Sequence, residues 1–222
     1  MKLVHVDFSR QLEIPRQNAV QWVIESPELF AQYVHDLYYQ WGGQDGRFVL
    51  VEQDKELDFT KSVEMILNPF SVNLEDKRII TKLYQELQSI AVNEIMYQQT
   101  TELMQLLQQY FYELEQQSPY MLTMNQTNDV VPLLKALGVQ LECETMDFFE
   151  TLHLYIRIVA ELLKKKLIVF VQIGRYFTPT QRQQLIQTAA HHDISLLFIE
   201  TQELDYANDV PRYIMDVDGC EI

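Results

Sequence analysis

The sequence of 222 residues predicts an α/β fold that is interrupted by a helical arm. Residues 167–171 and 196–199 are continuous apolar runs, which is the pattern of strands covered on both faces of a parallel sheet. A capped helix at 178–190 separates the two runs and makes a βαβ unit, whose crossover is expected to be right-handed. Residues 75–117 contain no glycine or proline and repeat apolar residues at helical spacing. This segment is too long to lie fully against a small sheet, so we expect it to project as an arm.

The elements before the arm follow from periodicity and from helix start and stop signals. Alternation of apolar and polar residues predicts the strands. Ser26-Pro27 is a helix start and Gly42-Gly43 a helix stop, and the apolar residues between them have the three-four spacing of a buried stripe. The expected elements are, in order, strands at 2–8 and 19–25, a helix between Ser26 and Gly42, a strand at 48–52 and a helix at 60–67 that stops before Pro69.

The apolar spacing within the arm predicts one long helix, or a helical hairpin that breaks near residues 98–101. After the arm, the patterns predict a strand at 120–124, a helix at 129–137 ended by Gly138, a strand at 139–142 and a helix at 146–163. These assignments place residues 1–70 and 119–222 in an α/β head domain and residues 71–118 in the arm.

Apolar residues on the arm exceed what one small sheet can cover, and an uncovered apolar surface is typical of subunit association. The sequence therefore predicts an oligomer contact on the arm. Its candidate residues are Leu103, Leu106, Leu107 and Tyr110.

The first turn of the βαβ unit decides whether the fold carries nucleotide chemistry. A phosphate loop there needs Gly-x-x-x-x-Gly-Lys-Ser/Thr, because backbone amides must approach the phosphates and a lysine must reach them. The turn 172–178 has one glycine, Gly174, and no lysine, while Thr178, Pro179 and Gln181 form a capping box. The sequence predicts a nucleotide-kinase-like (P-loop-type) core without a functional phosphate loop, and therefore no bound nucleotide.

Composition narrows the class of protein further. A net charge of −15 argues against a freely exposed nucleic-acid surface unless the few basic residues are concentrated. The first residues lack the apolar core of a secretory signal, and no apolar run is long enough to span a bilayer. Cys143 and Cys220 provide neither a disulfide framework nor a zinc spacing. We expect a soluble cytoplasmic protein with no membrane partner.

Catalytic patterns are absent from the sequence. His191, His192 and Asp193 are adjacent at a helix end, so their side chains point in different directions and do not make a metal or acid–base site. No nucleophile elbow, zinc-protease motif or dinucleotide-binding glycine pattern occurs. We expect that the protein is not an enzyme.

Several segments resemble one family in their order and spacing. They are 164–171 with Gly174 and Phe177-Thr178, then 196–200 with Glu203-Leu204, then 211–216, and upstream 63–67, 83–87 and 133–139. Together they resemble the ring-forming, DNA-end-binding accessory proteins of type II-A CRISPR systems. The resemblance covers most of the chain and implies a homotetrameric ring that threads double-stranded DNA ends in spacer acquisition, a step of antiviral defence. It also implies partnership with the CRISPR integrase complex and the RNA-guided effector nuclease.

Under this resemblance, basic side chains would line the central hole and contact DNA phosphates without reading sequence. The candidates are Lys164, Lys165, Lys166 and Arg175, with Lys135 and Arg16 as weaker ones. The alternative explanation for the three consecutive lysines is that they complement the dipole at a helix C-terminus.

The resemblance also implies calcium held by carboxylates near the junction of arm and head. The corresponding stretch, 118–129, has one acidic residue where several are expected. Calcium takes six to eight oxygens with substantial carboxylate charge. Asp129, Glu142 and Glu144 could form a reduced site, but a solvated acidic cluster is the alternative that the low carboxylate count favours.

Two other functions stay open from the sequence. An adaptor that scaffolds the adaptation proteins without binding DNA would also suit the acidic composition and the arm. A nucleotide-dependent enzyme would need a glycine-rich turn that the sequence lacks.

Overall fold

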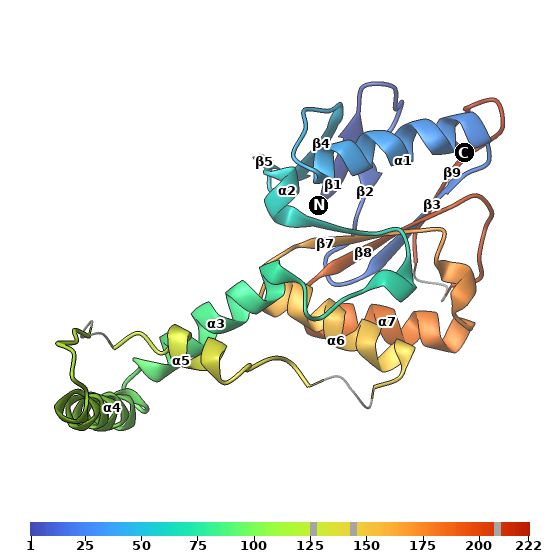
Figure 1. The fold of residues 1–222 in the computed structure, drawn as a ribbon. Helices are drawn as coiled ribbons and strands as arrows, with labels where there is room; N and C mark the ends of the chain where they lie inside the picture. The colour runs from blue at the N-terminus through green and yellow to red at the C-terminus, as the bar shows by residue number, and fades with distance from the viewer. Residues whose placement is uncertain (125–127, 143–145, 207–209) are drawn as a thin grey trace. The chain divides into compact units, whose positions relative to one another are not determined.

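The computed structural model describes residues 1–124, 128–142, 146–206 and 210–222. Contacts within the chain divide it into two compact units, one made of residues 1–73 and 143–222 and the other of residues 74–142. The first unit is mixed α/β with a parallel sheet, as the sequence predicts (Figure 1). The inserted unit runs farther than the predicted arm, because residues 119–142 belong to it and not to the head.

The centre of the first unit is a five-stranded sheet in which all neighbouring strands are parallel. The predicted βαβ unit is confirmed, since Leu167 pairs with Ser195 and Val171 with Ile199 in parallel register. In spatial order the strands are β6 (Val63–Ile66), β7 (Leu167–Val171), β8 (Ser195–Glu200), β3 (Ala19–Ile24) and β9 (Arg212–Met215).

A second, antiparallel sheet covers one face of the parallel sheet together with helix α1 (Pro27–Trp41), as Figure 1 shows. Apolar side chains from both sheets and α1 form one buried cluster, which includes Leu3, Trp22, Leu37 and Val169. The antiparallel strands, in spatial order, are β2 (Leu12–Glu13), β1 (Lys2–His5), β4 (Phe48–Glu52) and β5 (Lys55–Leu57).

Helices α6 (Phe148–Glu161) and α7 (Pro179–His191) cover the opposite face of the parallel sheet (Figure 1). Both begin with a capping box, and the predicted pair Thr178 and Gln181 forms the one on α7. The short helices α2 (Phe59–Ser62), η1 (Pro69–Ser71) and η2 (Gly174–Tyr176) complete the unit.

The inserted unit contains α3 (Lys77–Ala91), α4 (Tyr97–Gln117) and α5 (Val131–Ala136). The helices α3 and α4 form the predicted interrupted pair, but the break lies at residues 92–96 and not at 98–101. Asn93 explains the position, because its Oδ1 accepts hydrogen bonds from the backbone amides of Ile95 and Met96, both at 2.9 Å, and so favours a turn over a continuous helix. Gly138 ends α5 with a φ of +64°, as predicted.

Three predicted elements are wrong. Residues 63–66 form strand β6 and not a helix, because the whole segment is buried and pairs with β7, so tertiary pairing overrides the local apolar spacing. The strands expected at 120–124 and 139–142 do not form in those described residues. No described strand lies beside either segment to accept its backbone hydrogen bonds, and a strand needs such a partner.

Candidate nucleic-acid interface

The amino edge of the parallel sheet gathers four of the predicted DNA-binding residues. Arg16 lies just before β3, and Lys164, Lys165 and Lys166 lie just before β7. Parallel strands begin at the same edge, and β8 alone separates β7 from β3. Two strand spacings place Lys166 and Arg16 about 10 Å apart along this edge. We call Arg16, Lys164 and Lys166 the amino-edge cations.

Lys164 is exposed and follows the end of α6 with a φ of +56°. Its side chain makes no ion pair with any residue that the structure describes. Lys166 is also exposed and pairs with the carboxylate of Glu52. Both ammonium groups therefore face solvent, and one of them has an acidic neighbour.

Arg16 forms a bidentate ion pair with Asp193, with Nε 3.0 Å from Oδ1 and Nη2 2.8 Å from Oδ2. The hydrogen bond from Arg16 lowers the pKa of Asp193, and one from Gln17 adds to the effect. Both partners of the ion pair are more than half exposed. An exposed pair of this kind contributes little free energy, about 0–1 kcal/mol, so a phosphate can replace the carboxylate.

Lys165 differs from its two neighbours, and its placement revises the predicted DNA-binding set. Its side chain is only 10% exposed, and Nζ lies 3.9 Å from Oε2 of buried Glu64. The same ammonium donates hydrogen bonds to the backbone carbonyls of Val63, at 3.0 Å, and Thr60. Lys165 therefore joins β6 to the start of β7, and its ammonium is not available to a phosphate in this structure.

The remaining two candidates lie elsewhere. Arg175 is in η2, after β7, so the length of that strand, about 17 Å, separates it from the lysines. Its guanidinium donates to Gln202. Lys135 is on α5 in the inserted unit. The structure thus brings together Arg16, Lys164 and Lys166, and it does not bring Arg175 to them.

Lys77 is a further candidate for contacting DNA phosphates, and the sequence did not single it out. It is exposed at the first position of α3 and lines, with Lys135 and Glu75, a hollow whose floor includes Ile80 and Tyr84. A cation at a helix N-terminus is unfavourable for the helix dipole. That unfavourable position was the signal in the sequence that could have marked Lys77.

The carboxyl edge of the parallel sheet is where open α/β sheets bind nucleotides, at the point where the strand order reverses. Here the point lies between β3 and β8, because the chain continues from β3 toward β6 and from β8 toward β9. The turn after β3 is Glu25-Ser26-Pro27-Glu28, which has two acidic residues and no glycine. Ser26 caps α1 there, and its Oγ accepts from the Leu29 amide at 3.5 Å.

At the same edge, Glu200 ends β8 and is almost fully buried. Burial raises the pKa of Glu200 to about 7, although a hydrogen bond from the Gly174 amide and the charges of Arg175 and Arg182 act to lower it. The backbone amide that a phosphate would need in the turn 172–178 therefore already has a carboxyl partner, at 2.8 Å.

The calcium prediction rests on Asp129, Glu142 and Glu144, and Glu144 lies outside the described residues. Asp129 accepts a hydrogen bond from the Val131 amide through Oδ1, at 2.9 Å. In the described portion of the chain, no group of three His, Cys, Asp or Glu side chains could hold a metal ion. Calcium needs several carboxylate oxygens in one place, and the described residues alone do not supply such a set, so the calcium prediction stays open.

The four predicted association residues are exposed on α4, with Leu106 at 64%. Exposed apolar side chains continue along the inserted unit, where Met121 is 99% exposed. Exposed apolar side chains that gather in this way are typical of interaction sites, so the predicted association contact stays a prediction. The residues concerned include Ile95, Leu103, Leu107, Tyr110, Tyr112, Leu114 and Tyr120.

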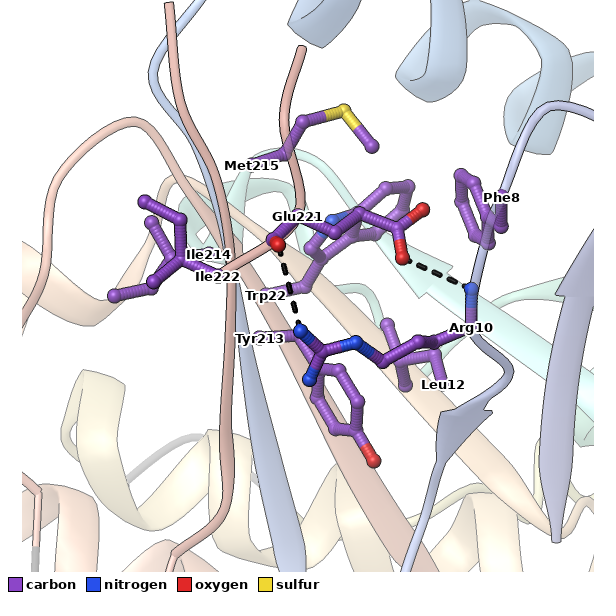
Figure 2. Close-up of a pocket in the computed structure, with 9 residues that line it drawn as sticks. All are labelled: Phe8, Arg10, Leu12, Trp22, Tyr213, Ile214, Met215, Glu221 and Ile222. Carbon is purple, nitrogen blue, oxygen red and sulfur yellow. Dashed lines mark hydrogen bonds between the residues drawn. The ribbon is translucent and has the colours of Figure 1, made fainter.

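A small hollow beside β9 is shown in Figure 2. The Glu221 carboxylate accepts hydrogen bonds from the amides of Ser9, at 2.7 Å, and Arg10, at 2.9 Å. Apolar side chains such as Trp22 and Met215 form the rest of the lining. The chain's own groups thus satisfy the carboxylate in this hollow, which gives a ligand little to bind.

The structure defines an α/β protein with an inserted helical unit and a cluster of cations at the amino edge of its parallel sheet. The family described as CRISPR-associated protein (Cas_Csn2) matches residues 40–219. The chain belongs to this family.

Two curated relatives support this assignment. The chain is 34% identical to CRISPR-associated protein Csn2 of Streptococcus agalactiae over 89 residues. The matched stretch covers 40% of this chain and 39% of that protein. It is 31% identical to CRISPR-associated protein Csn2 of Enterococcus faecalis over 71 residues. This matched stretch covers 32% of each chain. The chain therefore spans less than half the length of the curated relatives it matches.

Solved structures to which the chain is similar include cbiO1 from Clostridium perfringens, described as part of the ABC transporter complex cbiONQ. That likeness has a TM-score of 0.48 and 14% identity, and it covers 100% of this chain and 86% of the other. A nucleotide-free ATP-binding cassette from an ABC transporter gives a TM-score of 0.47 and 12% identity, over 100% of this chain and 91% of the other. Across the described helices, none is both long and apolar enough to cross a membrane.

Proposed function

We propose that this protein is a non-catalytic, cytoplasmic double-stranded DNA end-binding protein that acts as a homotetrameric ring in CRISPR spacer acquisition. In this role it would work with the CRISPR integrase complex and the RNA-guided effector nuclease. Membership of a CRISPR-associated family supports the general role. The observation that carries the DNA proposal is the gathering of Arg16, Lys164 and Lys166 at one edge of the sheet.

The electrostatics of that edge suit a polyanion in spite of the overall charge of −15. Lys164 faces solvent, Arg16 pairs with the exposed carboxylate of Asp193, and Lys166 pairs with the half-buried carboxylate of Glu52. Phosphate contacts of this type give affinity without sequence preference and release counterions. Four subunits in a ring would repeat the cluster four times around one duplex.

The absence of catalysis is part of the proposal. The turn after β3 presents Glu25 and Glu28 at the start of α1, so its charge opposes a triphosphate. The turn after β7 has its Gly174 amide bonded to Glu200. The core is therefore proposed to be of the P-loop type without a functional phosphate loop. Calcium stays a prediction from the family resemblance, because Glu144 of its expected ligand set lies outside the described residues.

The test of DNA binding is a titration with a short blunt duplex at several salt concentrations. The variant Lys164→Ala/Lys166→Ala should bind more weakly and with a shallower salt dependence, because the log–log slope falls by roughly 0.9 for each phosphate that the protein no longer neutralises. The matched control is Arg10→Ala/Arg47→Ala, which removes two exposed cations elsewhere in the same unit. Equal slopes in the wild type and the amino-edge variant would remove this edge from the DNA site.

The alternatives have their own readouts. Calorimetric titration with ATP should show no binding, and micromolar affinity that a Gly174 substitution abolishes would favour a nucleotide-dependent enzyme. The exposed apolar surface of the inserted unit also suits an adaptor that assembles other proteins. No measurable affinity for blunt duplex at low salt, in a protein that still assembles, would favour that adaptor.

A further inference from the structure

The turn after β7 is hydrogen-bonded to the buried carboxyl group of Glu200, a residue of the next strand β8. Glu200, at the end of β8, is 2% exposed, and its Oε1 accepts a hydrogen bond from the Gly174 amide at 2.8 Å. A Cβ atom added to Gly174 would lie 2.7 Å from Glu200 Oε1 and 2.7 Å from the Tyr206 hydroxyl. The contact therefore requires glycine at 174 and places the carboxyl group close to the tyrosine hydroxyl.

Arg182 of α7 also holds the turn 172–178 in place through hydrogen bonds to backbone carbonyls. Its Nη1 donates to the carbonyls of Gly174, at 2.9 Å, and Phe177, at 2.7 Å, and its Nη2 donates to the carbonyl of Asp205, at 2.6 Å. The guanidinium also lies 5.1 Å from the centre of the Tyr206 ring. Arg182 thus ties the turn 172–178 to the segment 201–206, and its hydrogen bonds go to carbonyls and not to Glu200.

Among the residues that the structure describes, none makes a direct ion pair with Glu200. Arg182 and Arg175 act on it through space, and Arg175 is exposed and bonded to Gln202. The Tyr206 hydroxyl is buried and has no hydrogen-bond partner among the residues that the structure describes. Among the described residues the Gly174 amide is the one hydrogen-bond donor to Glu200, so an ionised Glu200 would be a buried charge with a single donor. Burial of such an ion is unfavourable.

We propose that Glu200 is a proton-controlled latch on the turn 172–178. When the carboxyl group is neutral, it holds the Gly174 amide and the turn stays closed against the segment 201–206. When it ionises, the buried charge draws water or Arg175 inward and the turn loosens. The turn carries Arg175 and Tyr176, so the latch controls the position of these two side chains at the carboxyl edge of the sheet. The inference stands apart from the proposal of DNA binding at the amino edge.

The direction of the pH dependence follows from the raised pKa. The group titrates at 4.5 in an unfolded chain and at about 7 here. Between these values the folded state holds more protons than the unfolded state, so the contribution of Glu200 to stability falls as the pH rises toward 7. Above about pH 7 the contribution is constant. The latch is therefore closed most firmly below about pH 4.5 and loosens as the pH rises to about 7.

Hydrogen exchange at the amides of residues 174–177, corrected for the intrinsic effect of pH, tests the latch. In the wild-type protein the protection should fall as the pH rises from about 4.5 to about 7, by no more than about tenfold per pH unit for a single group, and should level off above pH 7. Glu200→Gln, which is neutral at every pH, should keep the protection constant. The control Glu25→Gln changes an exposed carboxylate at the same edge and should behave like the wild type.

The same fall in protection in Glu200→Gln as in the wild type would overturn the proposal, and so would protection that rises with pH. If Glu200→Gln does not fold, a carbon-13 titration of the wild-type Glu200 carboxyl group decides the matter. A midpoint near 7 supports the latch, and a midpoint near 4.5 contradicts it. Neither measurement uses DNA, so a failure of the DNA proposal would leave this test unaffected.

Discussion

Lys165 and Glu64 place opposite charges side by side beneath the surface of the first unit, with Lys165 Nζ 3.9 Å from Glu64 Oε2. The second carboxylate oxygen of Glu64 accepts a hydrogen bond from the Tyr155 hydroxyl at 2.9 Å. Glu64 lies on β6, Lys165 precedes β7, and Tyr155 comes from α6. Glu64 therefore connects the edge strand β6 both to the start of β7, through Lys165, and to helix α6, through Tyr155.

Lys165→Ala should destabilise the protein far more than the same change at Lys164. Removing the lysine leaves the Glu64 carboxylate buried without its cation, and breaking a buried pair typically costs about 3–5 kcal/mol. Lys164 is exposed, so Lys164→Ala should change the free energy of unfolding by no more than about 0.5 kcal/mol. Urea denaturation of the two variants makes the comparison. Equal decreases in stability would show that the buried pair contributes nothing of note.

The sequence predicted the elements whose signals are local. The continuous apolar runs of β7 and β8, the capping box at Thr178 and the glycine stop at Gly138 each depend on a few neighbouring residues, and all are present. Strand β6 was missed because Val63 and Ile66 also fit a helical spacing. Only the neighbouring strand β7, about a hundred residues later in the chain, decides between the two.

Prediction of the site was limited for the same reason. The lysine triplet stood out as a run of charge, but the sequence does not show that Lys165 turns inward to Glu64 while its neighbours face solvent. The ion pair between Arg16 and Asp193 joins residues far apart in the chain. The parallel register of β3 and β8 brings them to one edge, and that register is a property of the fold.

Leu106→Glu should dissociate the proposed assembly without unfolding the subunit. Leu106 is 64% exposed on α4, so a charge there is tolerated by the isolated subunit but is unfavourable in an apolar contact between subunits. Light scattering coupled to size exclusion measures the mass. Gln105→Glu adds the same charge at the adjacent exposed residue, and it should leave a larger share of the assembly intact. An unchanged tetramer in Leu106→Glu would place the interface elsewhere.

His153→Gln should reduce the loss of stability in acid. His153 Nδ1 lies 2.6 Å from the Thr188 hydroxyl, between α6 and α7, and burial lowers the pKa of His153 while the charge of Asp147 acts to raise it. Because the unfolded chain binds the proton first, near pH 6.5, this histidine lowers stability as the pH falls below that value.

The difference in thermal midpoint between wild type and His153→Gln, followed from pH 8 to pH 5, measures this contribution. The wild type should lose stability relative to the variant below pH 6.5. His35→Gln, an exposed histidine on α1, is the control and should follow the wild type. A constant difference across this range would mean that His153 keeps its ordinary titration on folding.

The threading of DNA through a ring predicts that binding requires a free end. A closed ring can load onto a linear duplex only from an end, so covalently closed circular DNA of the same sequence should bind much more weakly than its linearised form. A single cut by a restriction enzyme should restore the binding. The comparison belongs at low salt, because the amino-edge cations act through phosphate contacts that salt weakens. Lys164→Ala/Lys166→Ala should reduce binding of the linear form and leave the small residual binding of the circle nearly unchanged. Equal affinity of the wild type for circular and linear DNA would contradict threading, and binding to the outside of an open assembly would then explain the DNA contacts.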